Sequence, residues 1–223
     1  MNYISMFDVI GPNMIGPSSS HTAGACSMAL LARKMAHFEV KKVVFTLYGS
    51  FARTYHGHGT DKALVGGILG FSTDDERIRD SFELAKEAPL DFSFDINTED
   101  KPEHPNTADI LMTGETPDET LMVRGVSIGG GKIKITKIND ITIEFTGEYN
   151  TLIVKQTDLP GVVAHLTAVL ANNNINIAFM RLFREGKGGT AFTVIESDDF
   201  IPDSIIEEMK DNKKVKDIML IGV

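Results

Sequence analysis

Hydrophobic residues recur with a helical period near the start of the chain and with a strand-like pattern further on. Met28, Leu31, Ala32 and Met35 are spaced i, i+3, i+4 and i+7, which predicts an amphipathic helix over residues 22–38. Downstream, short apolar runs rich in β-branched and aromatic residues are separated by turn residues, as in strands. The pattern therefore predicts a chain that combines helices and strands.

The first two thirds of the chain are predicted to fold as one α/β (α+β) block, with helices early and strands later. A strand is expected at 41–50, followed by a helix at 60–69 with Thr60 as its N-cap. A third helix is expected at 77–88, because Pro89 cannot continue it. Five further strands are expected at 92–96, 109–114, 120–128, 132–138 and 141–145. This order is typical of an α/β domain.

The last third of the chain has a different order, β-α-β-β-α-β. The predicted strands are 149–156, 175–183, 190–196 and 215–221, and the predicted helices are 162–171 and 202–210. A glycine-rich hairpin at 186–189 joins the second strand to the third. This order defines a ferredoxin-like unit. The two domains are expected to meet near 146–148, so that they comprise residues 1–147 and 148–223.

The composition of the chain mainly excludes certain classes of function. The 223 residues include 22 basic and 31 acidic ones, and the net charge of −9 argues against binding to nucleic acid or an anionic membrane surface. Residues 72–103 hold eleven acidic and four basic side chains and are interpreted as solvated surface. No apolar run is long enough to span a membrane, and the first residues lack the pattern of a secretory leader. The expected location is cytoplasmic.

The chain has a single cysteine, Cys26. One cysteine cannot form an intrachain disulfide, and it cannot by itself supply the thiolates of an iron–sulfur cluster. A cluster made of this chain's own thiolates is therefore excluded.

The densest polar segment lies directly before the first predicted helix. It contains three consecutive serines (18–20), then His21 and Thr22, and Gly-Pro pairs at 11–12 and 16–17 predict a rigid loop. The backbone N–H groups at a helix start, together with hydroxyl groups, bind a carboxylate or a phosphate readily. A helix cap alone would need one hydroxyl, so the segment is predicted to be a binding loop.

A second polar segment follows the strand predicted at 41–50. His56, His58, Thr60 and Asp61 lie between the end of that strand and the next helix, where α/β folds place ligands. His58 stands between two glycines and can reach a substrate, and imidazole is the usual general base near neutral pH. A metal pair of His56 and His58 is only weakly indicated by their spacing. An exposed loop with incidental histidines is the alternative.

Two glycine-containing turns are further candidates. Residues 125–129 match G-x-S-x-G, but a strand follows instead of a helix, so a nucleophile elbow is rejected, as is a P-loop. What remains is a triple-glycine hairpin at 129–131, either a plain turn or a backbone N–H cradle for an anion. In the tail, Asp158 and Gly161 lie between a strand and a helix. Their segment is either a tight turn, which is favoured, or a site for a small amphipathic ligand.

Together these motifs resemble one known family. The segments GPSSSHTAGA at 16–25, GS-x-A-x-T-x-x-GHGTD-x-A at 49–63 and SIGGG at 127–131 are similar to the beta chain of bacterial iron–sulfur L-serine dehydratase. The block before Thr146 resembles that family's allosteric-substrate-binding-like domain. The tail, with its D-x-P-G turn, resembles an ACT domain, a small-molecule regulatory module. The chain departs from the family pattern at Tyr55 and His56, where a small and a basic residue are expected.

The resemblance implies a lyase that converts L-serine to pyruvate and ammonia. It implies a [4Fe–4S] cluster ligated by a separate alpha chain, with no metal ligand in this chain. The implied partners are L-serine, the alpha chain and a second copy that contacts the first through the ACT domain. His58 and His21 are the implied catalytic residues, with His58 as the base. The implied substrate-binding residues are Ser18, Ser19, Ser20, Thr22, Thr60, Asp61, Ser127, Gly129 and Gly130. The alternative function is a free-standing amino-acid sensor without catalysis.

Overall fold

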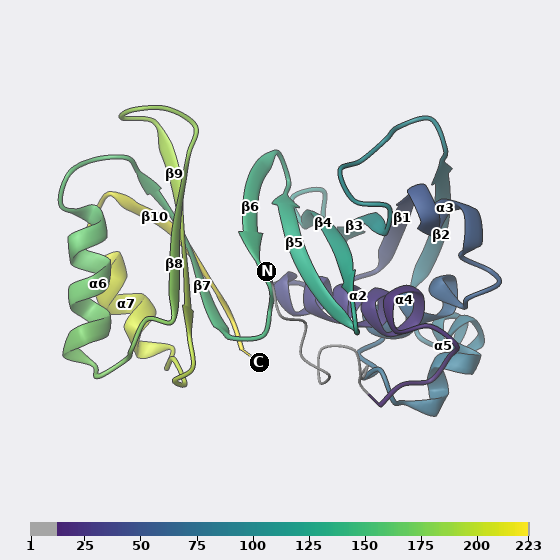
Figure 1. Cartoon of the computed structure of the whole chain (residues 1–223). Helices are drawn as coiled ribbons and strands as arrows, with labels where there is room; N and C mark the ends of the chain where they lie inside the picture. The colour runs from purple at the N-terminus through teal and green to yellow at the C-terminus, as the bar shows by residue number, and fades with distance from the viewer. Residues whose placement is uncertain (1–12, 223) are drawn as a thin grey trace, which may run out of the picture. The chain divides into compact units, whose positions relative to one another are not determined.

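The chain contains two β-sheets, each accompanied by helices (Figure 1). This computed structural model describes residues 13–222, so the Gly-Pro pair at 11–12 lies outside the described residues. The chain divides into two units, Met1–Ile141 and Thr142–Val223, which are called the first and the second unit below. Within 13–222, no helix is long and apolar enough to cross a membrane.

The first sheet is mixed and has the strand order β2-β1-β3-β4-β5-β6. β1 pairs with β2 in parallel, whereas β1–β3, β3–β4 and β4–β5 are antiparallel. The strands are β1 (Lys42–Tyr48), β2 (Asp91–Asn97), β3 (Thr107–Thr113), β4 (Thr120–Gly129), β5 (Lys132–Ile138) and β6 (Ile141–Phe145). The six strands predicted for this part of the chain are therefore confirmed.

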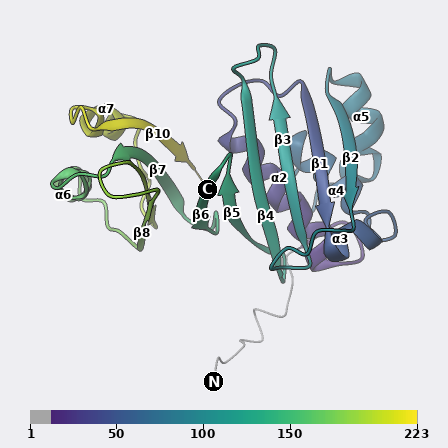
Figure 2. The same ribbon diagram turned by 90° about the horizontal axis from the view of Figure 1, so that it is seen from above.

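Helices α2, α4 and α5 cover one face of this sheet, and in Figure 2 they lie behind it. The helices of the first unit are α2 (Gly24–Met35), α3 (Gly49–Thr54), α4 (Thr60–Ile68) and α5 (Ser81–Glu87). α2 buries Met28, Leu31, Ala32 and Met35, which confirms the helix that their spacing predicts.

Two glycines bring α2 close to its neighbours. A Cβ atom on Gly67 of α4 would lie 2.5 Å from the Cys26 carbonyl oxygen and 2.7 Å from the Ala29 Cβ atom. A Cβ atom on Gly125 of β4 would lie 2.5 Å from Met28 Cγ. α2 is therefore packed tightly against both α4 and the sheet, which fixes the position of its N-terminus.

Two local expectations for the first unit are wrong. Thr60 is not the N-cap of α4: Gly59 takes that position with φ 65°, and Thr60 is the first helical residue. The helix expected at 77–88 is divided into a 3₁₀ turn, Glu76–Asp80, and α5. The division falls where Asp80 leaves the helical region, with φ −110° and ψ 15°.

After β6, which belongs to the first sheet, the second unit has the element order β7-α6-β8-β9-α7-β10 and the strand order β10-β7-β9-β8. Its elements are β7 (Asn150–Thr157), α6 (Val162–Asn172), β8 (Phe179–Arg184), β9 (Thr190–Ser197), α7 (Ser204–Lys210) and β10 (Val215–Ile221). The three strand pairs of this order are antiparallel. The predicted ferredoxin-like unit is confirmed, although the strand expected at 175–183 begins only at Phe179.

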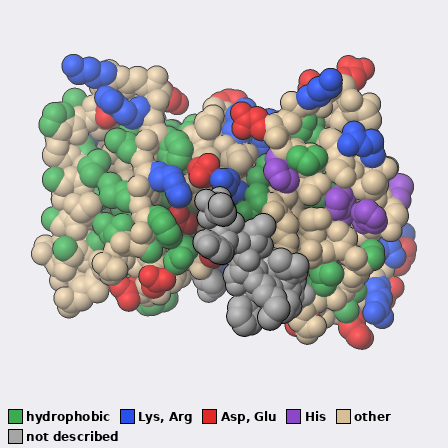
Figure 3. All heavy atoms as spheres, in the orientation of Figure 1, with side chains coloured by type: hydrophobic (Ala, Val, Ile, Leu, Met, Phe, Trp, Pro, Cys, Tyr) green, Lys and Arg blue, Asp and Glu red, His purple; other side chains and the backbone are tan. Residues whose placement is uncertain are grey.

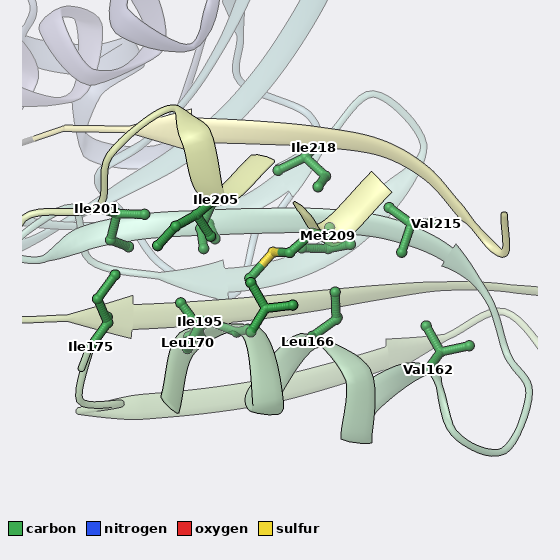
Figure 4. Close-up of a cluster of buried hydrophobic side chains, with 13 residues drawn as sticks. Val162, Leu166, Leu170, Ile175, Ile195, Ile201, Ile205, Met209, Val215 and Ile218 are labelled. Atoms are coloured by element: carbon green, nitrogen blue, oxygen red, sulfur yellow. The ribbon is translucent and has the colours of Figure 1, made fainter. Parts of the chain in front are cut away.

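The hydrophobic core of the second unit lies between its sheet and its two helices (Figure 4). Leu166 and Leu170 come from α6, Met209 comes from α7, and Ile195 and Ile218 come from the sheet, all less than a tenth exposed. α6 thus buries the face that its hydrophobic periodicity predicts.

Candidate active site

The serine-rich segment begins a helix instead of forming a loop before it. Ser18 is the N-cap, with φ −142°, and its Oγ accepts a hydrogen bond from the His21 backbone N–H at 3.1 Å. Ser19–Ala23 then forms a π-helical turn that continues directly into α2. Such wide turns occur often at functional sites. The hydroxyls of Ser19 and Ser20 therefore belong to the first turn of a helix.

Both ring nitrogens of His21 lie within hydrogen-bond distance of a serine hydroxyl. Nδ1 is 3.0 Å from Ser20 Oγ, and Nε2 is 2.9 Å from Ser50 Oγ. Ser50 lies in α3, which starts immediately after β1 because Gly49 adopts φ 56°. A Cβ atom on Gly49 would lie 2.5 Å from the Pro105 carbonyl oxygen, so the turn needs a glycine. Ser50 therefore fixes the orientation of the His21 ring.

The sequence predictions did not include Ser50 among the site residues. The signal for it was present, because Ser50 is the last residue of the strand predicted at 41–50 and belongs to the GS-x-A-x-T segment. What the sequence could not give is the partner of Ser50, since His21 lies 29 positions earlier in the chain.

The structure brings the two candidate catalytic histidines together. The ring centroids of His21 and His58 are 4.8 Å apart, and the rings are nearly perpendicular at 82°. Thr22 Oγ1 donates a hydrogen bond to the His58 carbonyl oxygen at 2.8 Å, which ties the two motifs to each other. Burial and, to a smaller extent, His58 lower the pKa of His21 from its ordinary value of 6.5. The His21 ring is therefore neutral near pH 7.

Three buried polar atoms of the predicted site residues have no hydrogen-bond partner among the described residues. They are His58 Nδ1, Thr60 Oγ1 and Ser127 Oγ. Buried polar groups without a partner are uncommon, because leaving one unsatisfied is costly. Their concentration in these motifs is what a site completed by a ligand or by another chain would show.

Ser127 lies near the end of β4, close to the start of α2. A Cβ atom on Gly24 would overlap the Ser127 hydroxyl, so the strand and the helix approach each other here through a glycine. Gly129 and Gly130 follow in the β4–β5 hairpin, with φ 101° and 61°. The rejection of a nucleophile elbow is consistent with this position, since Ser127 belongs to a strand that turns into another strand.

Asp61 contacts His56 instead of pointing at solvent. Its Oδ2 lies 2.6 Å from His56 Nδ1, and its Oδ1 accepts a hydrogen bond from the Lys62 backbone N–H at 2.8 Å. The Asp61 side chain is 6% exposed and that of His56 is 73% exposed. The ring of Tyr55 lies 4.0 Å from that of His56. Tyr55 and His56, where the chain departs from the family pattern, thus form one contact pair anchored by Asp61. Figure 3 shows histidine side chains at the surface of the first unit.

The candidate turn of the second unit is held by its own residues. Asp158 Oδ2 accepts hydrogen bonds from Arg184 Nε at 2.9 Å and from the Gly188 backbone N–H at 3.2 Å. Arg184 lowers the pKa of Asp158. Gly161 adopts φ 89° as the N-cap of α6. Asp158 therefore joins the turn to the β8–β9 hairpin.

The described residues offer no site for an iron–sulfur cluster. No group of three or more His, Cys, Asp or Glu side chains within 13–222 is arranged to hold a metal ion. Cys26 Sγ is buried and donates a hydrogen bond to the Phe71 carbonyl oxygen at 3.4 Å. Burial, reinforced by Asp75 and Asp74, raises the pKa of Cys26 to about 12. The thiolate that a cluster needs is therefore disfavoured here.

A cavity of about 230 Å³ lies at the other end of α2. Arg33, Phe38 and Leu90 are among its lining residues, none of which belongs to the predicted site. The cavity is therefore separate from the histidine pair.

Comparison with known proteins identifies the family. The family model of the serine dehydratase beta chain matches residues 5–137, and that of the ACT domain matches residues 150–213. The chain belongs to the serine dehydratase beta chain family and carries a C-terminal ACT domain.

Three relatives illustrate the match. The chain is 43% identical to the probable L-serine dehydratase, beta chain, of Bacillus subtilis over 94% of either chain. It is 47% identical to the L-serine dehydratase, beta chain, of Peptoniphilus asaccharolyticus over 79% of either chain. It is also 43% identical to an L-serine dehydratase of Streptomyces coelicolor, over 37% of this chain and 20% of that one. In that relative the matched segment is thus a small part of a longer chain.

Proposed function

We propose that this chain is the beta subunit of an L-serine dehydratase, which deaminates L-serine to pyruvate and ammonia together with an alpha chain. The observation that carries the proposal is the contact between two separate motifs, in which the ring centroids of His21 and His58 lie 4.8 Å apart. The unpartnered polar atoms around them support a site that is completed by substrate and partner. The names of two relatives support the same division, because each is called the beta chain of an L-serine dehydratase.

We propose that a [4Fe–4S] cluster is carried by the alpha chain. The residues of this chain do not fit such a cluster, since Cys26 is buried and hydrogen-bonded to the Phe71 carbonyl. When bound, a cluster with an open iron position would act as a Lewis acid toward the substrate hydroxyl, which is a poor leaving group.

This chain's residues would bind and orient the substrate. The helix start at Ser19–Ala23 offers backbone N–H groups and hydroxyls, and the positive end of the helix dipole favours a carboxylate. His21 is neutral, and its ring nitrogens lie against the hydroxyls of Ser20 and Ser50, so a substrate group that binds His21 would replace one of these hydroxyls. Ser127 and the N–H groups of Gly129 and Gly130 would complete the carboxylate site from the hairpin side. Thr60 and Asp61 would contribute at the start of α4.

His58 is the proposed base that removes the proton from Cα of L-serine. A neutral imidazole that accepts a proton at Nε2 carries its own proton on Nδ1. That N–H has no acceptor among the described residues, so the assembled enzyme is expected to supply one.

We predict that His58→Ala lowers turnover of the enzyme reconstituted with its alpha chain by about 10²–10⁴-fold, the usual contribution of general base catalysis. Pyruvate formation from L-serine under anaerobic conditions measures the effect. Circular dichroism and co-purification with the alpha chain serve as controls for folding and assembly. Near-normal turnover of a folded, assembled variant would show that another group is the base.

We further propose that the domains comprise residues 1–147 and 148–223, and that the second one regulates the enzyme or joins two copies of it. Its turn at Asp158 and Gly161 is the proposed ligand site. The open space beside Gly161 supports this proposal, because a Cβ atom on Gly161 would meet nothing within 4 Å.

A further inference from the structure

One face of the first sheet is not covered by the helices of its own unit. α2, α4 and α5 all lie behind the sheet in Figure 2, and the opposite face of β2, β1, β3 and β4 turns toward the viewer. Side chains on this face come from alternate positions of each strand. Leu111 on β3 is 38% exposed there, and Val44 and Met122 are half-buried.

The strand register arranges this face in rows. Leu111 pairs with Val44 of β1 on one side and with Met122 of β4 on the other, so the three form one apolar row across the middle of the sheet. The adjacent row, from β2 to β5, consists of Asp95, Thr46, Asp109, Arg124 and Lys137. The two rows put an apolar strip beside a charged one.

The centre of the charged row is rigid. Arg124 donates to both carboxylate oxygens of Asp109, at 2.6 and 2.7 Å, and Tyr48 Oη donates to the same carboxylate at 2.9 Å. Bidentate pairs of this kind hold both side chains in a fixed geometry. Their charges therefore compensate each other within the sheet.

The two ends of the face carry opposite charge. β2 presents Asp91 and Asp95, both exposed, whereas β5 carries Lys132, Lys134 and Lys137. β3 lies midway between β2 and β5 in the sheet. A two-fold axis parallel to β3 would therefore lay β2 of one copy over β5 of the other, and β1 over β4.

We propose that this face is an isologous interface between two copies of the chain. Under that symmetry Asp95 meets Lys137 of the second copy, Val44 meets Met122, and Leu111 meets its own counterpart on the axis. Because each contact of an isologous interface occurs twice, the Asp95–Lys137 pair forms at both ends of the face. Two sheets packed face to face in this way adopt the aligned arrangement of sandwiches.

Charge reversal tests the pairing in the full-length chain. Asp95→Lys and Lys137→Asp should each weaken the dimer by about tenfold or more, because each places like charges opposite one another at two positions. The double variant Asp95→Lys/Lys137→Asp restores the opposite charges and should recover the wild-type dissociation constant, measured by sedimentation velocity over a dilution series. Unchanged association in the single variants, or no recovery in the double variant, would overturn the proposal.

Cross-linking tests the axis independently of any contact through the second unit. Leu111→Cys should give a covalent dimer with a short bis-maleimide, because packed sheets lie about 10 Å apart. Ile96→Cys is the matched control, since Ile96 is 40% exposed but faces the helix side of the same sheet. Equal yields from the two variants, or linkage of position 111 to the alpha chain in the reconstituted enzyme, would show that a second copy does not cover this face.

Discussion

His21 combines a lowered pKa with hydrogen bonds to two serines, and this gives the first unit a defined response to acid. The unfolded chain binds a proton at His21 near pH 6.5, whereas the folded chain does so only at lower pH. The stability linked to neutral His21 is therefore fully present above pH 6.5 and is lost as the pH falls through the lowered pKa.

We predict that the melting temperature of the wild-type chain falls more steeply below pH 6.5 than that of His21→Asn. Thermal unfolding followed by circular dichroism between pH 5 and 8 measures both curves. His37→Asn, which replaces an exposed histidine, is the control and should follow the wild type. Parallel curves for wild type and His21→Asn would contradict the prediction.

The buried hydroxyl of Ser127 allows a role in substrate binding to be distinguished from a role in stability. Because its Oγ has no partner among the described residues, Ser127→Ala should change the free energy of unfolding by less than about 1 kcal/mol. If the hydroxyl binds the substrate carboxylate, kcat/KM of the reconstituted enzyme should fall by about 10- to 100-fold. Urea unfolding and pyruvate assays provide the two measurements.

Thr193 of β9 provides a matched control for Ser127. Its Oγ1 is also buried without a partner among the described residues, but it belongs to the second unit. Thr193→Val should leave both stability and kcat/KM nearly unchanged. A loss of activity in Thr193→Val as large as that in Ser127→Ala would argue for an indirect effect in both.

At the scale of elements, the contact between α2 and α4 depends on a single glycine. We predict that Gly67→Ala destabilises the chain by about 1–3 kcal/mol, although alanine favours helices, because the new Cβ would meet the backbone of Cys26 and Leu30 at 2.5 and 2.8 Å. Gly66→Ala is the control, since its nearest atom is Ile78 Cγ1 at 3.1 Å and that side chain can move. Similar unfolding free energies for the two variants in urea would contradict this account.

The elements also show which parts of the fold a sequence reveals. The strands were predictable because each is a short apolar run between turn residues, and α2 because its apolar residues repeat every three to four positions. The π-helical turn at Ser19–Ala23 was not, because its polar residues have the composition of a loop. Its helical form depends on the Ser18 cap and on the packing of α2. α3 was missed for a similar reason, since it is short and begins with Gly49 and Ser50.

The candidate site was predictable in its residues but not in its contacts. His21 and His58 stood out because each lies among hydroxyls or glycines at the start of a helix. Their proximity depends on β1 and α4, which bring distant segments together. The pairing of Asp61 with His56, in place of a free carboxylate, likewise depends on the fold.

At the scale of the whole molecule, the second unit is expected to influence the kinetics of the first. We predict that deleting residues 148–223 changes the shape of the saturation curve for L-serine, because an ACT domain is a small-molecule regulatory module. Initial rates of the reconstituted enzyme over a range of L-serine concentrations measure it. Gly161→Val is the companion variant, since φ 89° disfavours a side chain there while the core is untouched. Unchanged curves for both variants would leave the second unit with a role in assembly alone.

The burial of Cys26 has a consequence for how the enzyme responds to air. Oxygen-derived oxidants attack the thiolate form of cysteine, and a pKa of about 12 leaves almost none of it near neutral pH. The thiol is also shielded, with its proton directed to the Phe71 carbonyl oxygen. Aerobic storage is therefore expected to leave the cysteine chemistry of this chain unaltered. If the alpha chain carries the cluster, as proposed, the oxygen tolerance of the enzyme is a property of the alpha chain. The beta chain can then be purified in air.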